Sequence, residues 1–115
     1  MRSYLIEDLV DKDCQAIVAA FEELGFRGPI DDIYYLPLPA ELLQREQQEH
    51  LEECGPYFMA LECIKKEDEN SLKLELLVRG RKKMRCSCIS YATPDQRAHM
   101  LEYLDQFIDE LEVSI

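Results

Sequence analysis

The sequence predicts an α+β fold, a three-to-four-stranded antiparallel sheet with the two terminal helices packed on one face. Three observations support this class. Residues 57–91 hold three runs that suit a pleated, half-buried surface, and charged turns separate them into a meander. Apolar side chains recur at helical spacing near both ends of the chain. A helix-capping sequence precedes the last of these segments. The predicted order is helix, strand, helix, three strands, helix.

The first helix is expected from about Asp11 to Leu24, where apolar residues recur every three or four positions. Gly25 then suits the left-handed residue that often ends a helix. Ser3 and Asp11 are both reasonable N-caps. The pattern therefore leaves open whether residues 1–9 extend this helix or form a short edge strand.

Two further elements are expected between the first helix and the meander. Residues 30–36 favour a strand that Pro37 ends, and proline suits the edge of a sheet because it lacks a backbone donor. Residues 39–54 favour a helix that stops at Gly55-Pro56. The apolar side of this helix is thin, so we expect it to dock loosely on the surface.

The meander consists of strands 57–64, 72–78 and 84–91, joined by the solvated turn 65–71 and by a turn at Gly80. The first strand is apolar on both faces, which favours a central position. The second alternates apolar and polar residues, as a half-buried strand does.

The closing helix has the strongest local signal in the chain. The sequence Thr93-Pro94-Asp95-Gln96 supplies an N-cap hydroxyl, a proline at the first helical position and a glutamine placed to complete a capping box. Apolar residues from Met100 to Leu111 then form one stripe. We expect this stripe to pack on the sheet.

The composition indicates one acidic globular domain over residues 1–115. Acids number 24 against 13 bases, which gives a formal net charge of −11 and opposes binding to nucleic acid or anionic membranes. No apolar run is long enough to span a bilayer, and acids interrupt the start of the chain before any signal core. We therefore expect a cytoplasmic protein in which the five cysteines are free thiols.

Five of the 13 bases lie in one acid-free segment of seven residues: Arg79, Arg81, Lys82, Lys83 and Arg85. Bases of this kind can keep a sheet edge soluble. They can also bind an acidic partner surface, including the acidic helices of a second copy. Nucleic acid is disfavoured because the rest of the chain carries 24 acids against 8 bases and no aromatic residue is interleaved. We take these five residues as the candidate partner-binding site.

Cys86 and Cys88 form the first of two candidate metal or thiol sites. On a strand both thiols face one side, where Cys63 or Cys14 is a candidate third ligand. Alternation also places both thiols beside Met84 on the core face, where cysteine packs as a small hydrophobe. We therefore expect packing, with no metal and no cofactor. Whether these cysteines do more stays open.

His50 and Cys54 form the second candidate site, one helical turn apart, with Glu46 one turn earlier. Nothing in the sequence fixes a third group, so an ordinary wet helical face is expected. His99 in the last helix is likewise expected to be structural. The chain contains none of the common catalytic, phosphate-binding or dinucleotide-binding motifs, so we expect no enzymatic activity and no catalytic residues.

These patterns favour a non-enzymatic protein-binding module, a small acidic chaperone or adaptor. In size, acidity and helix-bounded sheet the chain resembles the type III secretion chaperones, although it shares no motif with them and their short helix interrupts the sheet later. The expected partner is another protein or a second copy, as in a homodimer. A bare second sheet face showing Leu77, Ile89 and Tyr91 is the expected contact.

Two alternative functions stay open. One is an acidic mimic of nucleic acid that inhibits a DNA- or RNA-binding protein. The other is a thiol- or metal-dependent protein that uses His50 with Cys54, or Cys86 with Cys88.

Overall fold

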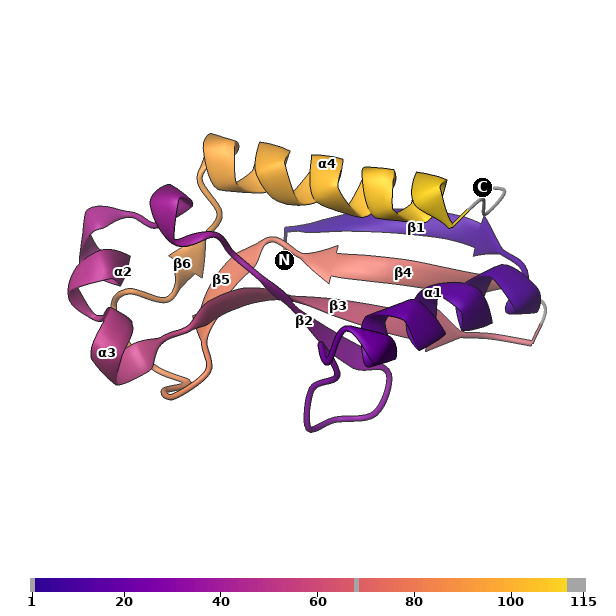
Figure 1. Ribbon diagram of the computed structural model, residues 1–115, viewed down its shortest axis with the longest axis horizontal. Coiled ribbons are helices and arrows are strands. Elements are labelled where there is room, and N and C mark those ends of the chain that lie inside the picture. Colours follow the sequence, from indigo (N-terminus) through magenta and orange to yellow (C-terminus); the bar gives the residue numbers. More distant parts are fainter. Residues whose placement is uncertain (1, 68, 112–115) are drawn as a thin grey trace.

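The computed structural model describes residues 2–67 and 69–111 and has an antiparallel sheet of six strands with helices on one face (Figure 1). The elements are β1 (Ser3–Leu9), α1 (Asp11–Glu23), β2 (Ile33–Pro37), the 3-10 helix η1 (Ala40–Leu42), α2 (Arg45–Glu49), α3 (Leu51–Cys54), β3 (Tyr57–Lys65), β4 (Asn70–Glu75), β5 (Leu77–Gly80), β6 (Ser90–Tyr91) and α4 (Pro94–Glu110). The α+β class is confirmed, whereas the number of strands and the order of elements differ from the prediction. Within the described residues, no helix is long and apolar enough to cross a membrane.

Strand β3 lies in the middle of the sheet, as its two apolar faces predict. Leu61 of β3 pairs with Leu74 of β4, and Phe58 pairs with Arg79 of β5, while β2 pairs with the opposite side of β3. The register moves by two residues between these two pairs, so β4 and β5 form one long strand interrupted at Leu76. Strand β1 pairs with β4, and β6 pairs with β5. The open question about residues 1–9 is settled in favour of a strand over Ser3–Leu9, and residue 1 lies outside the described residues.

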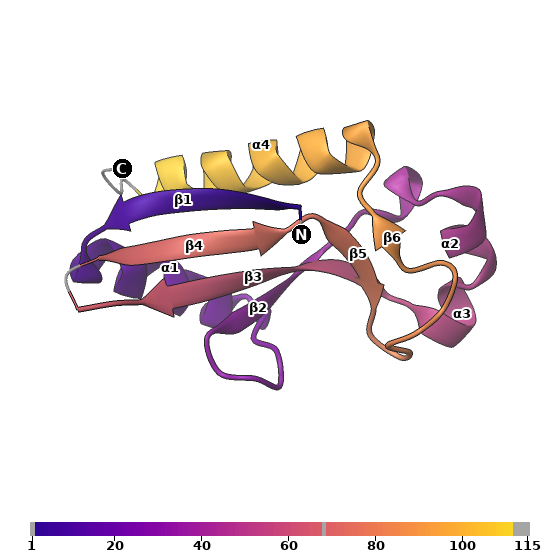
Figure 2. The ribbon, with the colours of Figure 1, turned by 180° about the vertical axis from the view of Figure 1, so that it is seen from behind.

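Helices α1 and α4 cover the same face of the sheet, as predicted. The rings of Phe21 in α1 and Phe107 in α4 stack with centroids 4.4 Å apart. Ile17 of α1 and Leu104 of α4 are fully buried against the strands. Burying such large apolar side chains is the main stabilising term for this layer. Figure 2 shows the opposite face, on which no helix covers β3 or β4.

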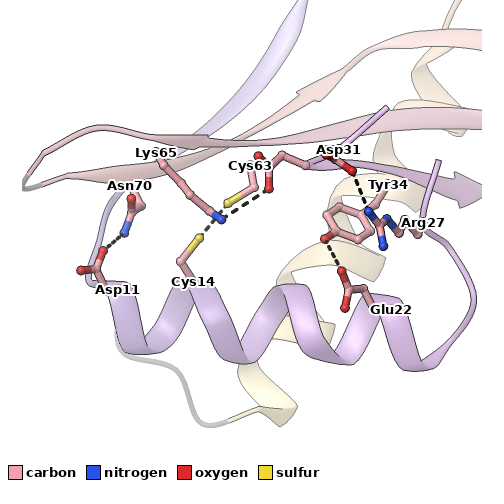
Figure 3. Close-up of polar contacts among 10 residues, drawn as sticks. Asp11, Cys14, Glu22, Arg27, Asp31, Tyr34, Cys63, Lys65 and Asn70 are labelled. Atoms are coloured by element: carbon pink, nitrogen blue, oxygen red, sulfur yellow. Dashed lines mark hydrogen bonds and ion pairs between the residues drawn. The ribbon is translucent and has the colours of Figure 1, made fainter. Parts of the chain in front are cut away.

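Polar contacts along α1 fix its position against the sheet (Figure 3). The Sγ atoms of Cys14 and Cys63 are 2.8 Å apart and buried, and Asn70 Nδ2 donates to Asp11 Oδ1 at 2.6 Å. Asp11 was one predicted N-cap, but the N-cap position belongs to Val10, which makes no side-chain cap bond. The carboxylate of Asp11 accepts a hydrogen bond from Asn70 of β4 and makes no cap bond with the backbone of the helix.

The predicted helix 39–54 is divided into η1, α2 and α3. Leu43 has an extended backbone with ψ of 140°, which separates η1 from α2. The division allows side chains from two different directions to reach the core: Gln47 is 1% exposed and Cys54 is 0% exposed. The segment is therefore docked firmly, which corrects the expectation of a loose surface helix.

The predicted third strand, 84–91, is wrong for most of its length. Only Ser90–Tyr91 form a strand, and residues 81–89 form a loop. Met84 is 85% exposed, so it does not share a core face with the two cysteines that follow it. The backbone N–H of Ile89 donates to Cys86 O at 3.0 Å, a local turn that takes the place of a strand ladder.

Gly80 ends β5 and has a different role from the predicted turn residue. A Cβ atom at this position would collide with the backbone carbonyl of Cys54. The close approach brings the start of the 81–89 loop against α3, and the backbone N–H of Lys82 donates to Cys54 O at 3.0 Å. Glycine is needed here because two backbone segments touch.

The capping box of α4 is confirmed. Gln96 N donates to Thr93 Oγ1 at 3.1 Å, and Thr93 N donates to Gln96 Oε1 at 3.0 Å. Of the three residues predicted to show on a bare sheet face, only part of the expected exposure is seen, and their contact with a partner stays a prediction. Leu77 and Tyr91 pair across β5 and β6 and Tyr91 is exposed, whereas Ile89 packs against the core.

Candidate metal centre

The junction of α2 and α3 presents His50 and Cys54 on one side. The backbone N–H of Cys54 donates to His50 O at 2.8 Å, a helical i to i+4 bond. Residues with this spacing lie on the same face of a helix. The predicted shared face of His50 and Cys54 is therefore confirmed, and it points toward the 81–89 loop.

The 81–89 loop delivers the other two donors. Backbone bonds from Arg81 N to Pro56 O and from Lys82 N to Cys54 O, each 3.0 Å, hold its start beside α3. The turn between Cys86 and Ile89 then directs Cys86 and Cys88 toward the same place. Alternation along a strand is not the cause of their common direction.

His50, Cys54, Cys86 and Cys88 form one cluster in which all four donor atoms lie within 4.8 Å of one another. His50 Nδ1 is 3.1 Å from Cys86 Sγ. The two pairs that the sequence offers as alternative sites are therefore brought together as a single site. Within residues 2–67 and 69–111, this is the one group of at least three such side chains placed to hold an ion.

The other residues considered as ligands beside these pairs are not part of the cluster. Cys14 and Cys63 contact each other between α1 and β3 (Figure 3). Glu46 accepts a hydrogen bond from the Ser87 hydroxyl, at the edge of the cluster. His99 lies half-buried in α4, as a structural histidine would.

A second layer of hydrogen bonds supports the cluster. Tyr57 donates from its hydroxyl to Cys88 Sγ at 3.4 Å, and Gln47 Nε2 donates to Cys88 O at 3.2 Å. Gln47 Oε1 accepts from Gln96 Nε2 at 3.0 Å, which connects the cluster to the capping box of α4. Such outer contacts orient ligands and reduce their freedom. Sequence patterns gave no sign of Tyr57 or Gln47, because their roles depend on contacts across 31 and 41 residues.

The thiols of the cluster have different acidities. Hydrogen bonds from the Cys88 backbone and thiol, and then from His50 and Cys54, lower the pKa of Cys86 to about 6. Burial, helped by hydrogen bonds with Cys86 and Cys88, raises the pKa of Cys54 to about 12. The hydrogen bond with Cys86 raises the pKa of His50. The Cys86 thiolate is thus favoured at neutral pH, and a bound cation would be needed to deprotonate Cys54.

The donor set fits a tetrahedral zinc ion. Zinc binds sulfur at about 2.3 Å and imidazole nitrogen at about 2.0–2.1 Å, so its ligand atoms lie about 3.5–3.8 Å apart. In the cluster, His50 Nδ1 and Cys86 Sγ are 3.1 Å apart and no two donor atoms are more than 4.8 Å apart, so only small movements are needed to meet this geometry. Three thiols and one imidazole are soft donors that select zinc over magnesium or calcium.

The basic segment, residues 79–85, lies beside the cluster. Several of its side chains bind other parts of the same chain. Arg79 forms an ion pair with Glu75, with Nε 2.7 Å from Oε1. Lys82 Nζ donates to the backbone carbonyl of Glu52 at 2.9 Å. These contacts tie the segment to β4 and α3.

The remaining bases of the candidate partner-binding site face solvent more fully. Lys83 Nζ lies 3.7 Å from Glu53 Oε2, an exposed pair that contributes little to stability. The Arg81 guanidinium lies 5.0 Å from the centroid of the Tyr35 ring. Arg85 is exposed. The five bases therefore do not form one uniform patch.

Comparison with known proteins adds no relative: no protein-family model, no curated protein and no solved structure matches this chain.

Proposed function

We propose that this protein binds one zinc ion through His50, Cys54, Cys86 and Cys88, and that the ion has a structural role. The observation that carries the proposal is the convergence of four soft donors, from two separate chain segments, within 4.8 Å. Clusters of three cysteines and one histidine are a common structural zinc set.

The structural role follows from the donor count. Four protein ligands fill a tetrahedral shell and leave no position for water or substrate, whereas catalytic zinc keeps one position open. Cys54 and Cys88 are buried, and His50 and Cys86 are half-buried. The ion would join the short helix α3 to the irregular 81–89 loop.

The zinc site is compatible with the protein-binding function that the sequence favours. A small domain gains folding free energy from a structural ion and so can hold an irregular loop rigid. In this chain that loop carries Arg81, Lys82, Lys83 and Arg85 of the candidate partner-binding site. We propose that the ion fixes a basic loop that meets another protein, and the zinc site supports that proposal without identifying the partner.

Metal analysis of purified protein tests the proposal. Protein produced with zinc in the medium is dialysed against metal-free buffer, and its zinc is measured by mass spectrometry. The expected result is one zinc per chain, with loss of the metal in Cys54→Ser and in Cys88→Ser. Cys63→Ser is the matched control because Cys63 is a buried cysteine outside the cluster. Zinc contents that are equal in all three variants would overturn the proposal.

A further inference from the structure

The face of the sheet opposite α1 and α4 carries a groove of about 780 Å³, here named the open-face groove. Its floor is formed by Tyr35 of β2 with Phe58 and Ala60 of β3. Ile30, before β2, and Met84, after β5, also line it and are largely exposed. Figure 2 views the molecule from the side on which β3 and β4 are uncovered by helices.

The floor and rims of the groove are apolar. The rings of Tyr35 and Phe58 stack with centroids 3.8 Å apart. Ile30 is 62% exposed and Met84 is 85% exposed, although both are large apolar side chains. Exposed apolar residues that surround an aromatic floor mark an interaction surface more often than scattered ones do.

The charge around the groove is opposite to that of the whole protein. The lining contains four bases and two acids, whereas the chain has a net charge of −11. Glu75 is held by Arg79 at 2.7 Å, and Asp31 beyond the rim is held by Arg27 at 2.6 Å. No acidic side chain of the described residues is paired with Arg81. Lys73 lies opposite Glu62 across β4 and β3, so Arg81 is the lining base that presents uncompensated positive charge beside the apolar floor.

We propose that the open-face groove binds an acidic amphipathic helix of another protein. One apolar side chain of that helix would occupy the floor between Ile30 and Met84, and its carboxylates would meet Arg81 and the rim bases. Charge complementarity with the groove favours an acidic occupant, and it speeds association as well as selecting the partner. A sheet face is most readily covered by a helix, as α1 and α4 cover the other side of this sheet.

Addition of a strand is disfavoured, because the outer edge of β2 is already used. Tyr35 N donates to Phe26 O at 2.7 Å, and Gly28 N donates to Ile33 O at 2.8 Å. These bonds occupy the backbone groups through which an added strand would pair. Recognition therefore depends on side chains in the groove rather than on the sheet edge.

A second copy of this chain is a poorer occupant than another protein. Its acidic helix α4 lies on the opposite face of the sheet from the groove. A contact between the groove and α4 would be head-to-tail and would leave a free groove and a free helix at the ends of each assembly. Such contacts make chains of molecules unless a rotation closes them.

Fluorescence anisotropy with a designed probe tests this proposal, which goes beyond the zinc site. The probe is a labelled amphipathic peptide of about 15 residues, long enough to form a helix, with leucine on one face and glutamate on the other. A second peptide carries lysine in place of each glutamate. Zinc-loaded protein is expected to bind the glutamate peptide at least about tenfold more tightly than the lysine peptide.

Variants locate the binding to the groove. Arg81→Glu and Met84→Glu are each expected to weaken binding of the glutamate peptide about tenfold, which corresponds to the loss of one important contact. Arg97→Glu makes the same charge change at an exposed position of α4, on the other face, and should leave affinity unchanged. Met84 is 85% exposed, so Met84→Glu should not disturb folding. This variant therefore tests the groove even if Arg81→Glu fails to fold.

Three outcomes would overturn the proposal. The first is absence of binding to the glutamate peptide, and the second is equal binding to both peptides. The third is self-association in sedimentation that Arg81→Glu abolishes, since it would assign the groove to a second copy. Zinc content is measured in each variant, so failure of the groove proposal is distinguished from failure of the zinc site.

Discussion

His50 Nδ1 lies 3.1 Å from Cys86 Sγ, although the two residues are 36 positions apart in the chain. Neither residue belongs to a strand, and the contact joins the end of a short helix to an irregular loop. An imidazole and a thiol placed in this way, with two further thiols within 4.8 Å, form a ligand set before any ion is bound.

Thiol reactivity should report whether an ion protects Cys86. In metal-free protein at pH 7, Cys86 is expected to react first with a disulfide reagent, because it is half-buried and its pKa is lowered to about 6 by hydrogen bonds from Cys88, His50 and Cys54. Cys14 and Cys63 are buried and should react slowly in either form. Mass spectrometry of the modified protein identifies the site. Equal rates for Cys86 with and without zinc would argue against its role as a ligand.

Gln96→Ala should destabilise the protein more than Thr93→Ala. Loss of the Thr93 cap costs about 1 kcal/mol. Gln96 is 0% exposed and also donates to Leu42 O and to Gln47 Oε1, so its removal leaves buried groups unpaired at a cost of about 1–3 kcal/mol more. Urea unfolding of both variants gives the comparison. Equal losses would show that the bonds to Leu42 and Gln47 add nothing to the cap.

Gly80→Ala should weaken both stability and zinc binding. The added methyl group would collide with the Cys54 carbonyl and push α3 away from the loop, at a cost of about 1–3 kcal/mol. Gly25→Ala is the matched control: Gly25 has a φ of 77°, and a Cβ there meets no atom within 4 Å. That variant should lose about 1–2 kcal/mol from backbone strain while keeping its zinc affinity. Zinc affinities measured by competition with a chelator decide between these expectations.

Alkaline pH should reveal the burial of Tyr34. Burial, and then the charge and hydrogen bond of Glu22, raise the pKa of Tyr34 from 10.0 to about 12. The unfolded chain therefore releases this proton first, and stability present below pH 10 is lost as the pH rises toward 12. Tyr34→Phe should remove this part of the loss, so the two proteins should converge in stability over that range. Parallel curves from pH 8 to 12 in denaturant titrations would contradict this.

Features that depend on neighbouring residues were predictable from the sequence. The capping box of α4 needs only Thr93 and Gln96, and the end of α1 at a left-handed Gly25 follows from glycine's freedom at positive φ. The edge position of β2 followed from Pro37, which has no donor for a neighbouring strand. Each of these signals comes from neighbouring residues, and in this fold no tertiary contact overrides it.

Features that depend on distant contacts were not predictable from the same patterns. Cys86 and Cys88 alternate as strand residues do, but Gly80 packs closely against the backbone of Cys54 and Lys82 N donates to Cys54 O, so residues 81–89 form a loop instead of a strand. The cluster combines the pair His50 and Cys54 with the pair Cys86 and Cys88. Neither pair carries a sequence signal that it lies beside the other in the fold. The open-face groove was not predicted from the sequence, because Tyr35 and Phe58 come into contact only when β2 pairs with β3.

Absorption spectroscopy of the cobalt-substituted protein tests the four-ligand site, because cobalt reports both the number and the type of its ligands. Metal-free protein is titrated with Co²⁺ under reducing conditions. If His50, Cys54, Cys86 and Cys88 bind one ion, strong visible bands of tetrahedral cobalt and a near-ultraviolet thiolate charge-transfer band should saturate at one equivalent and should disappear when zinc is added. Weak octahedral bands, or a spectrum unchanged by Cys54→Ser and Cys88→Ser, would contradict the account.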